Sequence, residues 1–146
     1  MNTYTRPLEL RWSDLDPNFH LRHSAYYDFG AYARIHFLTS HGLSTEAMME
    51  DKFGPILFRE ECIFRREIKL TDEVTVSVEL LKAREDFSRW SIQHQFVKNN
   101  DQLAAVLIVD GAWINTELRK LTGIPEHARE AFAKMPKAEN FEWIVK

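Results

Sequence analysis

Cysteine is almost absent from this 146-residue sequence, in which Cys62 is the single example. One thiol excludes an internal disulfide and a cysteine-based zinc cluster, and it is typical of a reducing compartment. No apolar run reaches the length that crosses a membrane, and the first residues lack the apolar segment of a secretory signal peptide. We therefore expect a soluble, cytoplasmic protein that does not insert into a membrane.

The sequence also lacks an excess of positive charge, internal repeats and low-complexity segments. Its formal net charge is −3 and its pI is about 6.1, which argues against a nucleic-acid-binding surface. Its composition, with 45% hydrophobic and 12% aromatic residues, is that of a globular protein. Because this length suits one hydrophobic core, we expect a single domain over residues 1–146.

The spacing of apolar residues predicts one long helix followed by strands. Residues 5–13 alternate like a half-buried strand, and Ser24 and Gly42 suit the two ends of a helix that is apolar on nearly all sides and therefore expected to be buried. Further elements are expected in chain order: a short helix over 45–52, four strands able to form a meander over 56–69, 74–80, 87–98 and 103–115, and a helix over 126–135. The sequence thus predicts an α+β fold in which one antiparallel sheet wraps around one helix.

The residues just before this long helix are the chemically richest in the chain. Two carboxylates and two imidazoles fall close together, namely Asp14, Asp16, His20 and His23. A helix N-terminus stabilises negative charge, so the segment suits a reaction in which such charge develops. Two other interpretations remain open. Asp-x-Asp-Pro is also a common turn whose carboxylates accept backbone N–H bonds, and the four side chains are all potential metal ligands.

Asp14-Leu15-Asp16-Pro17 resembles the Asp-x-Asp loop of the hot-dog fold, specifically of the acyl-CoA thioesterases similar to 4-hydroxybenzoyl-CoA thioesterase. His23-Ser24-Ala25-Tyr26 is similar to the His-x-x-Tyr of bacterial short-chain acyl-CoA thioesterases found with the Tol-Pal system. The order of the elements and Thr122-Gly123-Ile124-Pro125 extend the resemblance over nearly the whole chain. One segment departs from it. The family usually has glycine two or three residues after the second Asp, where this chain has Asn18-Phe19, and Phe adopts a left-handed backbone with difficulty.

The resemblance implies a hot-dog fold, with about five antiparallel strands around one central helix, and an enzyme that hydrolyses acyl-CoA without a cofactor or metal. Asp16 would attack the thioester carbonyl or deprotonate a water, and backbone N–H groups near His23 and Ser24 would bind the oxyanion. His23 would orient the substrate or assist proton transfer, with simple packing as the alternative. His20 holds a place where some family members have histidine. Tyr26 is a substrate-binding candidate, with helix core as its alternative.

Three more polar residues, Glu60, His94 and Asp110, fall on otherwise apolar strand faces. Buried ionisable groups are costly unless paired, so each is a candidate site residue, and a solvent or interface position is the alternative. Glu60 is the preferred candidate because it could meet the loop of a partner subunit. Basic residues for the phosphates of CoA lie near strand ends: Arg65, Arg66, Lys69, Lys82, Arg84 and Arg89.

The expected partners are an acyl-CoA substrate and further copies of the chain. A small sheet with a free edge tends to pair edge to edge, and in the family the resulting homodimers often assemble into homotetramers. Two other functions remain open. A hot-dog hydratase or dehydratase is suggested by the Asp and His that share a loop with Pro17, and a non-catalytic acyl-CoA-binding protein is suggested by Asn18-Phe19.

Overall fold

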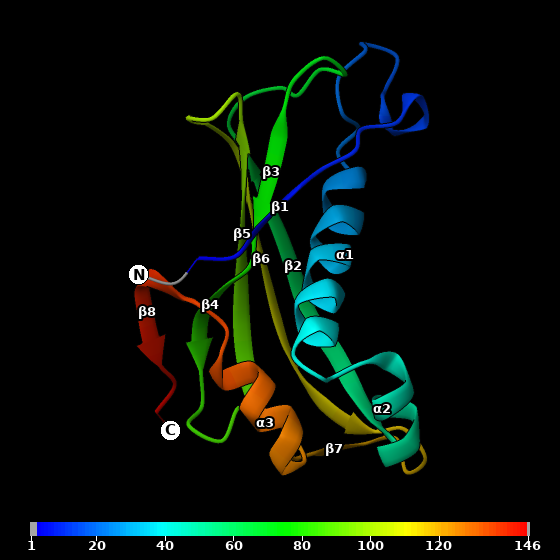
Figure 1. Cartoon of the computed structure of the whole chain (residues 1–146), viewed down its shortest axis with the longest axis vertical. Coiled ribbons are helices and arrows are strands. Elements are labelled where there is room, and N and C mark those ends of the chain that lie inside the picture. The colour runs from blue at the N-terminus through cyan, green and yellow to red at the C-terminus, as the bar shows by residue number, and fades with distance from the viewer. Residues whose placement is uncertain (1–2, 146) are drawn as a thin grey trace.

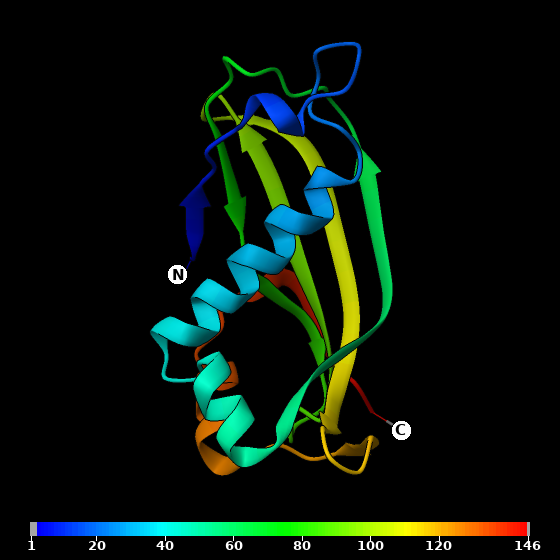
Figure 2. The ribbon, with the colours of Figure 1, turned by 90° about the vertical axis from the view of Figure 1, so that its right-hand side faces the viewer.

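A computed structural model of the chain describes residues 3–145, in which a long helix lies along the concave face of a curved sheet (Figures 1 and 2). The elements in chain order are β1 (Thr5–Pro7), the short 3-10 helix η1 (Trp12–Asp14), α1 (Ala25–Ser40), α2 (Thr45–Asp51), β2 (Phe53–Phe64), β3 (Val74–Ser77), β4 (Glu79–Ala83), β5 (Arg89–Lys98), β6 (Gln102–Asn115), β7 (Lys120–Thr122), α3 (Glu126–Ala133) and β8 (Lys137–Trp143). None of the helices within residues 3–145 is both long and apolar enough to cross a membrane.

The strand β6 occupies the centre of the sheet, as its nearly continuous apolar sequence predicts. It pairs antiparallel with β2 on one side and with β5 on the other, and β7 adds to its end. Because β2 pairs with β6 and not with β3, the four long strands do not form the simple meander that the sequence allows. Instead, residues 65–73 cross the end of the sheet and return the chain to its far side, where β3 and β4 pair with β5.

The sheet has eight strands, more than the five or so that the sequence predicts. One expected strand is divided into β3 and β4 at Val78, whose N–H donates to the carbonyl oxygen of Tyr4 at 3.0 Å instead of continuing the ladder with β5. The remaining difference comes from two short strands, β7 and β8, and β8 runs parallel to β4. The expected first strand is shorter than predicted, because the chain turns into η1 at Trp12.

The helix α1 begins and ends where its sequence predicts. Ser24 stands at the N-cap position, and Gly42 follows the C-cap with φ of +91°, a left-handed conformation that glycine adopts without strain. Within the helix, a Cβ atom at Gly30 would overlap Cδ2 of Leu107 and lie 3.2 Å from the ring of His94. Glycine therefore allows α1 to approach β5 and β6 closely.

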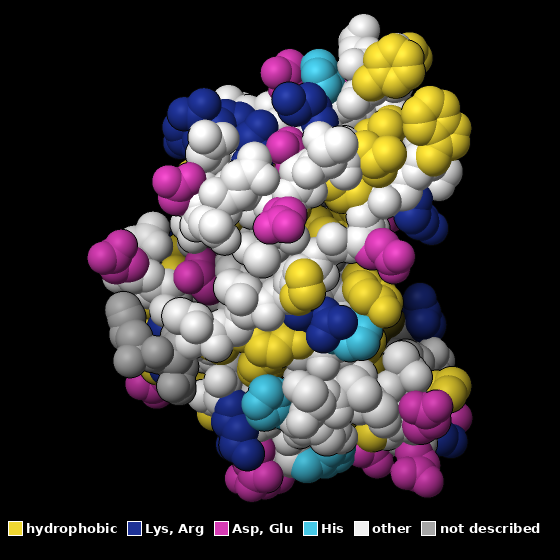
Figure 3. Space-filling model, turned by 45° about the horizontal axis from the view of Figure 1, so that its top comes forward, with side chains coloured by type: hydrophobic (Ala, Val, Ile, Leu, Met, Phe, Trp, Pro, Cys, Tyr) yellow, Lys and Arg dark blue, Asp and Glu magenta, His cyan; other side chains and the backbone are white. Residues whose placement is uncertain are grey.

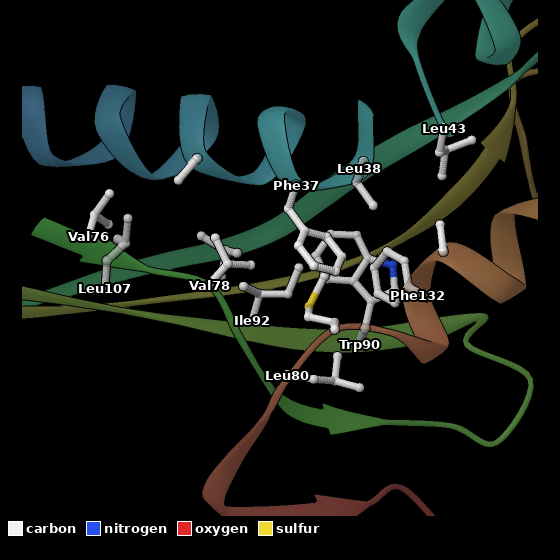
Figure 4. Packing of buried hydrophobic residues seen from close by; sticks show 14 of the residues in the cluster. Phe37, Leu38, Leu43, Val76, Val78, Leu80, Trp90, Ile92, Leu107 and Phe132 are labelled. Atoms are coloured by element: carbon white, nitrogen blue, oxygen red, sulfur yellow. The ribbon is translucent and has the colours of Figure 1, made fainter. Parts of the chain in front are cut away.

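The main core lies between α1 and the sheet (Figure 4). Phe37 from α1 is almost fully buried together with Ile92 from β5 and Leu107 from β6. Burying one such side chain contributes about 1.5–3 kcal/mol, so this layer fixes how α1 sits on the sheet. The opposite face of α1 stays exposed, with Tyr32 57% accessible. The prediction of a helix buried on all sides is wrong for the single chain, because the sheet covers only one face.

Candidate functional site

The two carboxylates of the Asp14-Leu15-Asp16 loop lie in different environments. Asp14 is 1% exposed, and its Oδ2 accepts from the backbone N–H and Nε of Arg11 at 3.0 and 3.1 Å, while Nη2 of Arg11 donates to Oδ1 at 2.8 Å. Nη2 of Arg22 lies 3.9 Å from the same Oδ1. The hydrogen bonds from Arg11 lower the pKa of Asp14 in spite of its burial. Asp14 therefore fixes the loop and is closed to a substrate.

Asp16 is only partly buried and closes a tight turn. Its Oδ1 accepts from the backbone N–H groups of Asn18 and His20 at 2.9 and 3.2 Å, and its carbonyl oxygen accepts from Phe19 N–H at 2.9 Å. Phe19 has φ of +67°, so it adopts the left-handed conformation that its side chain disfavours. The backbone of Asp-x-Asp-Pro thus forms the turn that the sequence allows. This turn orients the Asp16 carboxylate, because its hydrogen bonds hold one carboxylate oxygen.

A pocket of about 580 Å³ brings most of the predicted site residues together. It is lined by Asp16, His20, His23 and Tyr26. Ser24 is adjacent in the chain and exposed, but it is not part of the lining, and Glu60 is also outside it. The pocket lies at the N-terminal end of α1, at the end of the molecule where Figure 3 shows Lys and Arg side chains close to acidic and histidine side chains.

Tyr26 connects the pocket to the core. Its side chain is 2% exposed and packs edge-on against Phe64 and Phe96, with ring centroids 5.0 and 5.2 Å apart. Burial raises the pKa of Tyr26 to about 12, and the charges of Cys62 and Asp16 add to the effect. The phenol is therefore protonated at neutral pH. Tyr26 belongs to the core and also lines the pocket, and its role in substrate binding stays a prediction.

The N-terminus of α1 is left without a side-chain cap. Ser24 has the helical angles φ −73° and ψ −22°, and its hydroxyl makes no capping hydrogen bond. The first N–H groups of a helix have no acceptor within the helix. That of Ala25 donates to the carbonyl oxygen of Arg22 at 3.0 Å, and those of the next residues remain available for an anion. His23, which precedes Ser24, is exposed and lines the pocket. The expected cap at Ser24 is absent because a helical N-cap backbone turns the hydroxyl away from these N–H groups.

His20 also lines the pocket and contacts a segment that is distant in the sequence. Its Nδ1 is 3.5 Å from a carboxylate oxygen of Glu67, a residue that also lines the pocket. The backbone of His20 forms an isolated bridge with Lys69, which ties the loop to the crossing segment after β2. The loop and this segment, far apart in the sequence, thus form the two sides of one site.

Two of the predicted basic residues, Arg65 and Arg66, line the pocket just after β2. Lys98 joins them, although its Nζ already donates to the carbonyl oxygen of Glu67 at 2.6 Å. Sequence reasoning missed Lys98, Glu67 and Phe64. The only signal for Lys98 was its place at the end of a strand before the Asn99-Asn100-Asp101 turn. The other predicted basic residues lie outside this pocket, and Arg84 and Arg89 line a different one next to β7.

Glu60 is exposed on the free edge of β2. A bulge between Leu57 and Arg59 shifts the register, so Glu60 pairs with the fully buried Val109 and shares its face. Phe58 lies under the guanidinium of Arg89, 5.0 Å from it. Strict alternation along the expected strand puts Glu60 on the same face as Phe58, and this bulge makes that expectation wrong. In the single chain Glu60 does not reach the Asp16 pocket.

His94 and Asp110 do not join the pocket either. His94 is fully buried, with Nδ1 2.7 Å from the carbonyl oxygen of Ser77 and Nε2 3.0 Å from Nη1 of Arg34. Asp110 accepts from Oγ of Ser91 at 2.6 Å. The hydrogen bonds of His94 offset the cost of burying its ring. Asp110 is only half-buried and is paired as well, so neither residue requires a role at Asp16.

The metal interpretation of the loop has no support in its geometry. Within residues 3–145, no group of three or more His, Cys, Asp or Glu side chains could hold a metal ion. Both oxygens of Asp14 are held by Arg11, so the four residues of the loop do not converge.

Solved structures of a CoA-bound protein and of two CoA thioesterases share this architecture. A hypothetical protein from Staphylococcus aureus, determined in complex with CoA, matches with a TM-score of 0.85 and 21% identity over 99% of this chain and 89% of its own. A 1,4-dihydroxy-2-naphthoyl-CoA thioesterase from Synechocystis matches with a TM-score of 0.80 and 18% identity, covering 91% and 97%. A gentisyl-coenzyme A thioesterase matches with 0.76 and 22%, covering 88% and 99%. No curated protein matches significantly in sequence.

The family comparison agrees with the fold. A model of the thioesterase-like superfamily matches residues 10–132, a span that includes the loop, α1 and all strands from β2 to β7. The predicted hot-dog thioesterase family is thereby confirmed. The chain belongs to the thioesterase-like superfamily.

Proposed function

We propose that the protein hydrolyses acyl-CoA thioesters in the pocket between Asp16 and the start of α1. One observation carries the proposal: a carboxylate held by two backbone N–H groups shares a pocket with an uncapped helix N-terminus. A base or nucleophile next to free N–H donors is what attack on a thioester carbonyl requires. The names of the similar proteins, two of which are CoA thioesterases, support the same chemistry.

In the proposed reaction the thioester carbonyl oxygen points at the N–H groups of the first turn of α1. Within residues 3–145 the hydrogen bonds to the Asp16 carboxylate all end on Oδ1, which leaves Oδ2 to react. Oδ2 either takes a proton from a water that attacks the carbonyl carbon, or attacks that carbon itself. The carbon–sulfur bond then breaks, and the CoA thiolate leaves and takes up a proton. In the second route water hydrolyses the resulting anhydride and regenerates Asp16.

The two histidines have supporting roles in this proposal. His23 lies beside the helix N-terminus and lines the pocket, so it is placed to orient the substrate or to protonate the leaving thiolate. His20 holds the turn, because its N–H donates to Asp16, and its ring faces Glu67. Ser24 contributes the uncapped backbone and not its hydroxyl.

The phosphates of CoA would be bound by Arg65 and Arg66. Both line the Asp16 pocket and also an adjoining pocket of about 500 Å³ beside Gln102. Guanidinium groups bind phosphate oxygens with paired donors, and two of them at the mouth of the site suit a polyanionic carrier.

We further propose that the protein is a homodimer in which β2 pairs with its copy. β2 is an edge strand, and it exposes Ile63 and Phe64 at 44% and 50%. Long exposed apolar edges are typical of strands that pair with another chain. Such pairing would place Glu60 of one copy close to the other copy, which is the role the sequence suggests for it. A cytoplasmic location and a single domain over residues 1–146 complete the proposal.

The decisive experiment compares wild type, Asp16→Asn and Asp51→Asn on a panel of aliphatic and aromatic acyl-CoA thioesters, with release of free thiol as the readout. We expect kcat to fall at least about 100-fold in Asp16→Asn. Asp51→Asn is the matched control, because Asp51 is at the end of α2 and pairs with His127, outside the pocket. Full activity of Asp16→Asn, or no turnover of any thioester by wild type, would refute the proposal. Hydration of an enoyl-CoA without thiol release would indicate the hydratase alternative.

A further inference from the structure

A second pocket, the Arg34 pocket, lies farther along α1. It has a volume of about 300 Å³ and is lined by α1 between Ala31 and Leu38, the first halves of β2 and β5, the end of β6, and α3 with Met135 just after it. Its walls are apolar, with Leu57, Trp90, Phe132 and Met135 among them, and Arg34 is the one charged side chain in the lining. This volume is at the lower end of the range of small-molecule sites, which are typically apolar with few polar groups.

The guanidinium of Arg34 is held in place by His94. Nδ1 of His94 donates to the carbonyl oxygen of Ser77 at 2.7 Å, because a carbonyl oxygen only accepts. Nε2 of the neutral ring is therefore an acceptor, and Nη1 of Arg34 donates to it at 3.0 Å. Burial, together with the charge of Arg34, lowers the pKa of His94 to about 3, so the ring cannot become a competing cation at neutral pH.

The positive charge of Arg34 has no carboxylate partner at ion-pair distance within residues 3–145. Burial lowers the pKa of Arg34 to about 10, so it stays charged at neutral pH, and Glu60 acts on it only from farther away. A partly buried charge without a counter-ion is costly and favours an anion that enters its surroundings. Trp90 also lines the pocket, and its Nε1 is buried without a hydrogen-bond partner among the described residues.

We propose that the Arg34 pocket binds a carboxylate that carries an apolar body, with Arg34 paired to the carboxylate and the body packed against Trp90 and Phe132. The charge and the apolar walls together select this class, because an alkane offers nothing to the guanidinium and a small inorganic anion leaves the walls empty. About ten non-hydrogen atoms, as in octanoate, suit a site of this size. Arg34 lies about 13 Å along α1 from Ala25 at 1.5 Å per residue, so this site is separate from the reacting end of the Asp16 pocket.

The carboxylate can come from two sources that share this chemistry. One is a free carboxylic acid. The other is the far end of an acyl group that itself ends in a carboxylate. Binding of a free acid does not depend on the proposed thioesterase activity, whereas binding of the end of an acyl group rests on it. The experiment therefore measures binding first and turnover second.

Binding of octanoate and of 1-octanol to the full-length protein is measured by isothermal titration calorimetry. We expect octanoate to bind wild type at least tenfold more tightly than 1-octanol, and this preference to disappear in Arg34→Met. Arg34→Lys keeps the charge and should retain part of the preference, while Arg129→Met, which removes an exposed arginine from α3, should change nothing. Equal affinity for acid and alcohol, or unchanged octanoate binding by a folded Arg34→Met, would overturn the proposal.

A variant that fills the Arg34 pocket tests the proposal even if Arg34→Met does not fold. Ala31 is an exposed residue of α1 that lines the Arg34 pocket, so Ala31→Trp should weaken octanoate binding at least tenfold. Tyr32→Trp is its control, because Tyr32 is the next residue of α1 and is outside the lining. Octanoate that binds Ala31→Trp as tightly as wild type is bound elsewhere, which contradicts the proposal.

Two CoA thioesters then distinguish the two sources of the carboxylate. One is octanoyl-CoA, and the other is the CoA thioester of octanedioic acid, whose far end is a carboxylate. A tenfold preference in kcat/KM for the second that Arg34→Met abolishes identifies the substrate as the source. Equal kcat/KM values together with Arg34-dependent octanoate binding identify a free acid. If neither thioester is hydrolysed, an acyl group that ends in a carboxylate is not the source, and the calorimetry still decides whether the Arg34 pocket binds carboxylates. The proposed function itself fails only if no thioester of the whole panel is hydrolysed.

Discussion

Phe19 donates its backbone N–H to the carbonyl oxygen of Asp16 at 2.9 Å, and it does so with φ of +67°. A left-handed conformation costs a residue with a side chain about 1–2 kcal/mol relative to the right-handed region, a cost that glycine does not have. The turn that orients the Asp16 carboxylate is therefore formed by a residue that disfavours it. The hydrogen bonds of Asn18 and His20 to Oδ1 of Asp16 offset part of this strain.

We predict that Phe19→Gly is more stable than Phe19→Ala by about 1 kcal/mol, because both lose the ring but only glycine relieves the left-handed backbone. Urea denaturation of the two variants measures the difference. At an ordinary helical position the order is reversed, so Ala31→Gly against wild type is the internal reference. A Phe19→Ala variant more stable than Phe19→Gly would show that the backbone at this residue is not left-handed in solution.

Asp14 should govern stability at acid pH. Its folded-state pKa lies below the ordinary 3.8, so its contribution is fully present above about pH 4 and is lost as the pH falls through the lowered pKa. Asp14→Asn should reduce the free energy of unfolding at pH 7 by about 2 kcal/mol and make its decline below pH 4 shallower. Urea denaturation at pH 7, 4 and 3 checks both effects. Asp16→Asn, whose parent residue is not buried in an ion pair, should be close to wild type in stability at pH 7.

His94 should make the free energy of unfolding depend on pH in a higher pH range than Asp14 does. The pKa of His94 is about 3 in the folded protein and 6.5 in the reference state, so below pH 6.5 the unfolded chain binds a proton that the folded one excludes. Stability contributed by the neutral ring is thus fully present above pH 6.5 and declines toward pH 3. Between pH 7 and pH 5 the loss is about 2 kcal/mol for one group.

The variant His94→Gln keeps a donor for Ser77 and an acceptor for Arg34 but does not titrate. We expect its free energy of unfolding to fall by about 2 kcal/mol less than that of wild type between pH 7 and pH 5. His127→Gln removes an exposed histidine from α3 and should follow wild type. Parallel curves for wild type and His94→Gln would mean that His94 titrates normally in the folded protein.

Gly30 should tolerate no side chain. A Cβ at this position meets Cδ2 of Leu107, so Gly30→Ala should destabilise the protein by about 1–3 kcal/mol in spite of the better helix propensity of alanine. A Cβ at Gly123 has nothing within 4 Å, which makes Gly123→Ala the matched control. The midpoints of thermal unfolding of the two variants measure the contrast. A Gly30→Ala variant as stable as wild type would mean that α1 lies farther from β6 than described.

The proposed pairing of β2 predicts a dimer in solution. Light scattering at micromolar concentration should give twice the mass of the 17.2 kDa chain or a multiple of it. Because pairing uses the exposed edge of β2, Ile63→Lys should weaken the dimer, whereas Leu118→Lys, at an exposed residue of the turn before β7, should not. A strictly monomeric wild type would contradict the proposed interface.

Much of the site could be predicted from the sequence because its residues are close neighbours in the chain. Asp16, His20, His23 and Tyr26 lie within one short segment, and the helix start at Ser24 brings them to one pocket. Glu67 and Lys98 escaped prediction because they reach the pocket through the crossing after β2 and the β5–β6 turn. Local periodicity contains no information about such pairings.

The error at Glu60 has a different physical cause. Alternation assigns faces correctly only while a strand stays in register, and the bulge between Leu57 and Arg59 inserts one residue that reverses the phase. For His94 alternation did hold, and the sequence identified a buried polar residue. Its partner Arg34 is sixty positions away, so the pair and the pocket beside it appear only once α1 packs on β5.

The sequence by itself determined the long helix, the central strand β6 and the chemistry of the loop, because apolar spacing and short-range motifs act over a few residues. Tertiary structure alone decided which strands pair, which of the two loop carboxylates is free, and that a cation lines an apolar pocket. Asp14 and Asp16 are two residues apart and identical in type. Their difference arises from Arg11 and from the turn at Phe19, and so from three-dimensional contacts that composition and spacing do not encode.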